Sequence, residues 1–221
     1  MSDLEFRYYF DPLCGWCYAS APALAALAER HGDKLRMMPV GLFVEPRPIS
    51  AMADHAWRND QRISQLTGQR FSEEYHRKVL QAPDGVFTSK ALTLALAALG
   101  EIAPSLEARF LHAAQVARYV EGRDTSRVDE VVRIAATVAN EAAVAFDADA
   151  FADRLQNDKA LAERVEARMA AARAEMKSLP GSGVPQLLVA VGDKAHAVSG
   201  QPLYAGGDAL LATVEQLSRA A

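Results

Sequence analysis

The sequence predicts an α/β fold in which a β-α-β unit and a β-β-α unit are separated by a large, all-helical insertion. Three observations support this prediction. An aromatic run at residues 4–10 precedes an Ala- and Leu-rich helical pattern. Helical patterns then follow one another over residues 50–177, without a convincing strand. Strand character returns at residues 183–191, where Pro185 stands near the head of the strand, a position that a sheet tolerates.

The first unit is expected to contain two parallel strands. Residues 4–10 predict a strand with at least one buried face, because Leu, Phe and Tyr dominate them. A helix is expected from residue 14 to about residue 30, where a His-Gly pair ends it. Residues 34–43 form the second predicted strand. Because a single helix connects the two strands, we expect them to run parallel.

The second unit closes the predicted sheet. The strand at residues 183–191 ends at a Gly-Asp dipeptide that is typical of a hairpin turn. A shorter strand at residues 194–198 and a helix over residues 204–217 follow. Each of these elements is short, and together they repeat the α/β character of the first unit.

The chain is expected to divide into two domains. Residues 1–45 and 178–221 are assigned to the α/β domain, and residues 46–177 to the helical insertion. Within the insertion, Ser126 and Asp147 are expected to be the N-cap residues of two helices. The charged side chains of the inserted helices are expected to form a solvated face.

The two cysteines, Cys14 and Cys17, lie where the first strand gives way to the first helix. A helix start favours the thiolate, and two thiols at this spacing can open and close a disulfide. A zinc site needs four ligands, and the five histidines show no close pair, so no metal is predicted. A structural disulfide across so short a loop would remove little entropy from the unfolded chain. Thiol chemistry is favoured, with two unreactive core cysteines as the alternative.

Composition excludes several other classes of function. The net charge is -4, so a nucleic-acid-binding surface is disfavoured. The glycines form no phosphate-binding loop, and no apolar stretch is long enough to span a membrane. The start, Met1 to Glu5, carries two acidic residues and no basic region before an apolar core. We therefore expect no secretory signal and a cytoplasmic protein.

Three segments resemble one known family. They are Asp-Pro-Leu-Cys-Gly-Trp-Cys-Tyr at residues 11–18, Gly-Val-Pro at residues 183–185, and Gln-Val-Ala-Arg-Tyr-Val-Glu-Gly-Arg-Asp at residues 115–124. With these segments the chain resembles the DsbA-family, thioredoxin-like oxidoreductases. It is most similar to the cytoplasmic branch whose members are assigned as protein-disulfide isomerases. The resemblance covers essentially the whole chain and implies a thioredoxin-like fold with a helical insertion.

The resemblance also implies roles for individual residues. It makes Cys14 the exposed nucleophile, Cys17 the resolving thiol and Pro185 a cis-proline that faces the pair. A cis bond before Pro185 would expose the backbone of Val184 to an extended substrate. Trp16 either stacks on the substrate or covers the end of the helix, and the sequence leaves both open.

Departures from the family pattern predict a more reducing dithiol. Strongly oxidising relatives have proline and histidine between the cysteines, whereas Gly15 and Trp16 offer no cation here. Asp11, if close, would disfavour a second negative charge. Tyr8 stands where many thioredoxin-like proteins have a buried carboxylate. Asp11 is expected to cap the helix; relay of a proton to Cys17 is the alternative.

The expected function is that of a thiol-disulfide oxidoreductase or isomerase. The Cys14–Cys17 dithiol would reduce, form or exchange disulfides through a mixed disulfide, with no cofactor and with glutathione as a candidate co-substrate. The expected partner is a protein or small molecule that carries a thiol or a disulfide. The direction of electron flow and the oligomeric state are not predicted.

Two alternatives remain. Kappa-class glutathione transferases and hydroxychromene-carboxylate isomerases resemble this architecture and hold glutathione with a serine or equivalent at the position of Cys14. Their chemistry has no need of Cys17. A non-catalytic interaction module is the third reading.

Overall fold

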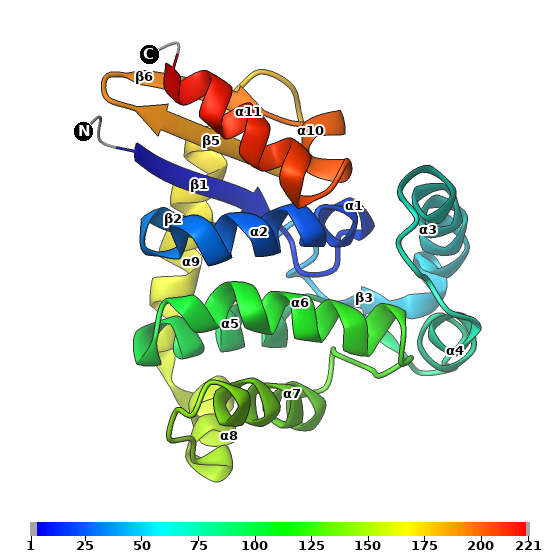
Figure 1. Cartoon of the computed structure of the whole chain (residues 1–221). Helices are drawn as coiled ribbons and strands as arrows, with labels where there is room; N and C mark the ends of the chain where they lie inside the picture. Colours follow the sequence, from blue (N-terminus) through cyan, green and yellow to red (C-terminus); the bar gives the residue numbers. More distant parts are fainter. Residues whose placement is uncertain (1–3, 220–221) are drawn as a thin grey trace.

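A four-stranded sheet lies at the centre of the α/β part of the molecule in the computed structural model, which describes residues 4–219. Its strand order is β2-β1-β5-β6. Strand β1 (Leu4–Phe10) is parallel to β2 (Leu35–Pro39) and antiparallel to β5 (Gln186–Val191), which pairs antiparallel with β6 (Lys194–Val198). Strands from the two ends of the chain therefore form one sheet, and the predicted thioredoxin-like fold class is confirmed (Figure 1).

The aromatic run of β1 explains its central position. Phe6, Tyr8 and Phe10 alternate along the strand and are almost completely buried in the main core. Tyr9 points to the other face and is also buried, in a small cluster with Ala172. A strand covered on both faces needs large apolar side chains at successive positions, as this sequence provides.

Helices cover the sheet and build the insertion (Figure 1). The helices are α1 (Gly15–Ala19), α2 (Ala21–His31), α3 (Ala53–Thr67), α4 (Glu73–Tyr75), α5 (Lys90–Ile102), α6 (Ser105–Tyr119), α7 (Val128–Glu141), α8 (Ala148–Asn157), α9 (Lys159–Met176), α10 (Gln201–Tyr204) and α11 (Gly207–Arg219). Helices α2 and α11 pack side by side over the sheet, and α9 packs against β2. Helices α5 to α8 form a helical layer, whereas α3 lies beside α1, and α4 lies below α3 in the view of Figure 1.

The first predicted helix is interrupted. Helix α1 ends at Ala19 and α2 begins at Ala21, with Pro22 in its first turn. Proline lacks an N–H group and crowds the carbonyl one turn before it, so a continuous helix is disfavoured here. The hydroxyl of Ser20 donates a 2.9 Å hydrogen bond to the carbonyl of Cys17 instead. Cys17 therefore lies in a short helix of its own.

Other predicted boundaries shift. Strand β2 is shorter than the predicted range, and the closing helix is split into α10 and α11 near Gly206, whose φ is 93°. The insertion also contains a two-residue antiparallel ladder, β3 (Arg47–Pro48) with β4 (Val86–Phe87), that the sequence does not predict. The domain boundaries remain predictions. Residues 1–3 and 220–221 lie outside the described residues. Residues 1–3 belong to the segment from Met1 to Glu5, in which no secretory signal is expected.

The two predicted N-caps have different outcomes. The side chain of Asp147 accepts a hydrogen bond from the Ala150 N–H at the start of α8, which confirms that cap. Ser126 is not a cap: Arg127 occupies the N-cap position of α7, and the Ser126 hydroxyl bonds to Asp124. Among residues 4–219, no helix has the length and apolar character needed to cross a membrane.

Candidate active site: the Cys14–Cys17 dithiol

The two cysteines are free thiols, and both are buried. Cys14 is the N-cap residue of α1 and is 8% exposed, whereas Cys17 is 0% exposed. The thiol of Cys14 donates to the carbonyl of Val184, with a sulfur–oxygen distance of 3.7 Å, although the two residues are 170 positions apart. The Val184–Pro185 peptide bond is cis, as the resemblance implies. The fold thus brings Cys14 beside the loop that carries Val184 and Pro185.

Burial dominates the environment of Cys17. It raises the pKa of the Cys17 thiol well above its usual range, and the hydrogen bond with Cys14 raises it further. Asp11 acts on Cys17 in both directions: a hydrogen bond with its backbone lowers the pKa of the thiol, and its negative charge raises it. Behind the thiols, the Tyr8 hydroxyl forms a 2.6 Å hydrogen bond with the Ser20 hydroxyl. These effects keep the Cys17 thiol protonated at neutral pH.

Asp11 stabilises the loop that precedes Cys14 through hydrogen bonds. Its carboxylate is completely buried and accepts hydrogen bonds from the N–H groups of Leu13 (2.9 Å) and Phe43 (3.0 Å) and from the hydroxyl of Ser89 (3.1 Å). Burial nevertheless raises the pKa of Asp11. The expected helix cap is wrong, because α1 has no side-chain cap hydrogen bond. Asp11 instead joins three segments around the dithiol.

Trp16 is half-buried, and its ring packs against Tyr204 of α10 with 4.9 Å between ring centroids. Burial raises the pKa of Tyr204 to about 12, and the charges of Cys17 and Cys14 add to this effect. Tyr204 packs against Trp16, the residue that directly precedes Cys17. Contact between Trp16 and a substrate remains a prediction.

The insertion touches the active-site loop on both sides of Cys14. On one side, the Tyr119 hydroxyl donates a 2.8 Å hydrogen bond to the Leu13 carbonyl. On the other side, Asp60 of α3 lies against Gly15: a methyl group added at Gly15 would overlap with Asp60 Oδ1. The loop is therefore shaped by residues far away in the sequence.

Asp60 is a functional candidate that the sequence did not reveal. It is 4% exposed, and burial raises its pKa to about 7. The Tyr75 hydroxyl donates a 3.0 Å hydrogen bond to Asp60 Oδ2. One signal could have found it: Asp60 lies four residues after Ala56 and three before Ile63, on the face of α3 that the core covers. The expected solvated face is wrong at this position.

A buried arginine accompanies Asp60. Arg118 is 1% exposed, and its guanidinium lies 5.6 Å from the ring centre of Tyr75 and 5.4 Å from that of Phe87. Its Nη1 donates a 3.5 Å hydrogen bond to Thr125, whereas Nε and Nη2 have no partner among residues 4–219. The positive charge of Arg118 lowers the pKa of Asp60, opposing the effect of burial.

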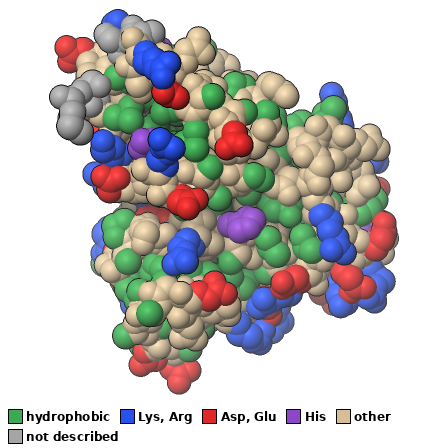
Figure 2. Space-filling model, viewed as in Figure 1, with side chains coloured by type: hydrophobic (Ala, Val, Ile, Leu, Met, Phe, Trp, Pro, Cys, Tyr) green, Lys and Arg blue, Asp and Glu red, His purple; other side chains and the backbone are tan. Residues whose placement is uncertain are grey.

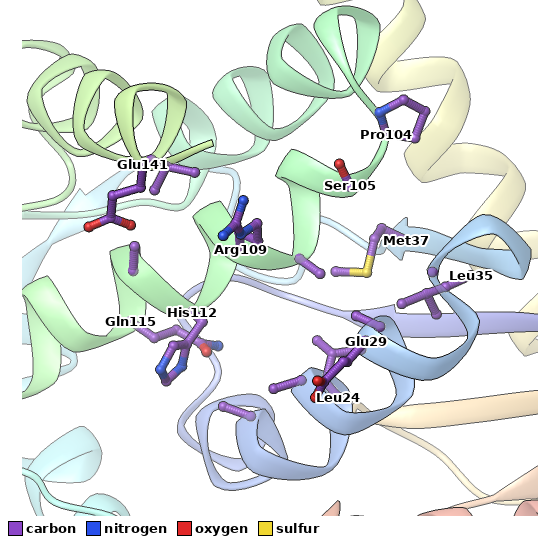
Figure 3. A pocket seen from close by; sticks show the side chains of 17 residues that line it. Leu24, Glu29, Leu35, Met37, Pro104, Ser105, Arg109, His112, Gln115 and Glu141 are labelled. Carbon is purple, nitrogen blue, oxygen red and sulfur yellow. The ribbon is translucent and has the colours of Figure 1, made fainter. Parts of the chain in front are cut away.

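A separate cavity of about 530 Å³ lies between α2 and α6 (Figure 3). Its walls include Leu24, Arg109 and His112, and none of the predicted site residues lines it. Gln115, which also lines it, is 2% exposed, and neither atom of its amide has a hydrogen-bond partner among the described residues. On this face of the molecule, acidic and basic side chains are interspersed and form no extended patch of one sign (Figure 2). No cluster of three metal-ligating side chains occurs within residues 4–219.

Solved structures share the fold of this chain. No family model matches the sequence, and a comparison with curated proteins finds no match either. The cytosolic disulfide reductase DsbM from Pseudomonas aeruginosa is 29% identical, with a TM-score of 0.83 over 98% of this chain and 100% of that chain. Its structure with GSH is 30% identical, with a TM-score of 0.81 over 97% of this chain and 99% of that chain.

More distant structures share the fold. A protein assigned as a protein disulfide isomerase from Nitrosomonas europaea is 20% identical, with a TM-score of 0.68 over 97% of this chain and 98% of that chain. A 2-hydroxychromene-2-carboxylate isomerase is 19% identical, with a TM-score of 0.54 over 97% of this chain and 94% of that chain. Fold and comparisons define a disulfide oxidoreductase with a thioredoxin-like fold and a helical insertion. Within that class, the chain belongs to the DsbA family.

Proposed function

We propose that this protein is a cytoplasmic thiol-disulfide oxidoreductase that reduces disulfides with the Cys14–Cys17 dithiol. The difference in exposure between the two thiols is the observation that supports this most directly. Both thiols are buried, but Cys14 keeps 8% of its surface accessible beside Val184, whereas Cys17 is 0% exposed. A nucleophile with some accessible surface, next to a fully buried second thiol, suits a reaction in two steps.

The mechanism begins at Cys14. Its thiolate attacks one sulfur of the substrate disulfide, a mixed disulfide forms, and the other substrate sulfur leaves as a thiolate that takes up a proton. Cys17 then loses its proton and attacks the sulfur of Cys14, which releases the second substrate thiol. Val184 would hold an extended substrate through its backbone, with Pro185 shaping the loop and Trp16 flanking it. The product is the Cys14–Cys17 disulfide.

Reduction is proposed over oxidation for two reasons. In strong oxidants, a cation stabilises the thiolate, and this disfavours the disulfide form. Gly15 and Trp16 supply no such cation, so the disulfide form of this dithiol is not destabilised in the same way. DsbM, the 30% identical relative, is a disulfide reductase and has been solved with GSH. We therefore propose glutathione, or a protein mixed disulfide of glutathione, as a co-substrate.

Trapping tests the mechanism. Cys17→Ser should accumulate a mixed disulfide with glutathione or with a test protein disulfide, detected by mass spectrometry, and Cys14→Ser should accumulate none. Equilibration of the wild-type protein in graded glutathione buffers should show a two-electron transition near about -270 mV, the range of reductases, rather than near about -120 to -180 mV. Full activity of Cys17→Ser with glutathione would instead favour a glutathione transferase or isomerase.

A further inference from the structure

We propose that Asp60 is a positioning residue of the dithiol site: its carboxylate, supplied by the insertion, controls through its charge how readily Cys14 forms a thiolate. The proposal rests on the proposed function in that it takes Cys14 as the nucleophile. It adds a residue from α3, a helix outside the sheet that carries the two cysteines.

The proposal rests mainly on the close contact between Asp60 and Gly15. A methyl group at Gly15 would overlap with Asp60 Oδ1 and lie 2.9 Å from Ile63 Cδ1, so α3 presses directly on the residue that follows Cys14. Tyr119 gives a second link between Asp60 and the dithiol loop. Its hydroxyl donates to the Leu13 carbonyl, next to Cys14, and its ring lies 5.1 Å from that of Tyr75, which donates a hydrogen bond to Asp60.

The two oxygens of Asp60 have different surroundings. Oδ2 accepts the hydrogen bond from Tyr75, which fixes the orientation of the carboxylate. Oδ1 has no hydrogen-bond partner among residues 4–219, yet it is not one of their fully enclosed polar atoms. The oxygen nearest Gly15 can therefore exchange a proton with water. Asp11, the other buried acid near the thiols, has both oxygens bonded to the protein.

The other groups around Asp60 do not change charge near neutral pH. Tyr75 and Tyr119 stay neutral, because burial raises the pKa of each phenol well above its usual range. The guanidinium of Arg118 stays positive. Asp60 itself, with a pKa of about 7, changes from neutral to negative in this range. Because like charges repel, an ionised Asp60 opposes the Cys14 thiolate, and a protonated Asp60 does not.

The test is the rate of Cys14 alkylation by iodoacetamide between pH 5 and 9.5, measured in a Cys17→Ser background. With Asp60 present, the rise of the rate with pH should flatten through neutral pH as Asp60 ionises. With Asp60→Asn, the flattening should disappear. The rate should be about three- to tenfold higher at pH 8.5 and unchanged below about pH 5.5.

Two variants complete the experiment. Asp54→Asn removes an exposed acid from the same helix and should leave the profile unchanged. Tyr75→Phe keeps the ring but removes a hydrogen bond that lowers the pKa of Asp60, so the flattening should move to higher pH. It also provides an independent test if Asp60→Asn does not fold. Coincident profiles in all variants would overturn the role of Asp60 alone, whereas an unreactive Cys14 would overturn the proposed function with it.

Discussion

Tyr119 donates a hydrogen bond to the carbonyl of Leu13, one residue before the nucleophile, across 106 positions of sequence. Tyr119 is 1% exposed and lies at the end of α6, so this contact fixes the active-site loop to the core of the insertion. The insertion is therefore part of the scaffold that positions Cys14, and changes within it should reach the thiol chemistry.

Removal of the Tyr119 hydroxyl should destabilise the protein. Tyr119→Phe leaves the buried Leu13 carbonyl without its partner, at a cost of about 1–3 kcal/mol in the free energy of unfolding. Urea denaturation measures the change. Tyr18→Phe is the matched control, since its ring packs 5.0 Å from that of Tyr119 and its hydroxyl has no hydrogen-bond partner within residues 4–219. Equal stability of the two variants would contradict the importance of the Tyr119 bond.

Gly15→Ala should also be destabilising, although alanine is the better helix former. The added methyl group meets Asp60 and Ile63, so α3 must move away from the loop, with an expected loss of about 1–3 kcal/mol. Thermal unfolding should show a lower Tm. Gly32→Ala is the control, because a methyl group there meets no atom within 4 Å. A Tm for Gly15→Ala at or above that of the wild type would argue against the close packing of α3.

The stability of the protein should depend on pH through Asp60. Its pKa is about 7 in the folded protein and near 3.8 in the unfolded chain, so the folded state binds the proton more tightly. Stability should therefore fall as pH rises from about 4 to 7. Asp60→Asn, which cannot ionise, should be more stable than the wild type at pH 8 by a few kcal/mol, roughly 2–4, and equally stable at pH 4. Chemical denaturation at both pH values checks this, and a difference independent of pH would contradict it.

The cavity between α2 and α6 yields a further prediction. Gln115→Leu replaces a buried amide that lacks partners with an apolar side chain of similar size, and should raise the free energy of unfolding by about 1–2 kcal/mol. Gln186→Leu is a suitable comparison, because the Gln186 amide nitrogen donates a 2.9 Å hydrogen bond to the Gly183 carbonyl that leucine would lose. If Gln115→Leu lowers stability instead, the native amide is hydrogen-bonded in solution.

Local patterns were sufficient to predict much of the sheet. Strands β1 and β6 coincide with their predicted ranges, because an aromatic run and a hairpin dipeptide define them within a few residues. The order of the elements and the family resemblance predicted the thioredoxin-like fold, but the antiparallel pairing of β1 with β5 was not itself predicted. The break at Ser20 was not predicted, since the apolar pattern continues across it and only Pro22 marks it.

The buried charges of the insertion could not be predicted in the same way. Asp60 stands in α3, whose other charges are exposed, and Arg118 stands in α6, where Glu107 is also buried. The residue types of these charges alone favour a solvated face. Only the packing of α3, α4 and α6 around the active-site loop buries them. The two cysteines, by contrast, could be identified from their spacing and from their position after a strand, which are both local features.

The order of synthesis has a consequence for the cell. Cys14 leaves the ribosome long before Val184, its partner 170 residues later, and β1 cannot form its pairing with β5 until both are present. At ordinary rates of translation this interval lasts roughly 10–30 s. During that time the two thiols belong to an unfinished nascent chain without their protecting neighbours. A compartment that keeps thiols reduced would preserve them until folding is complete.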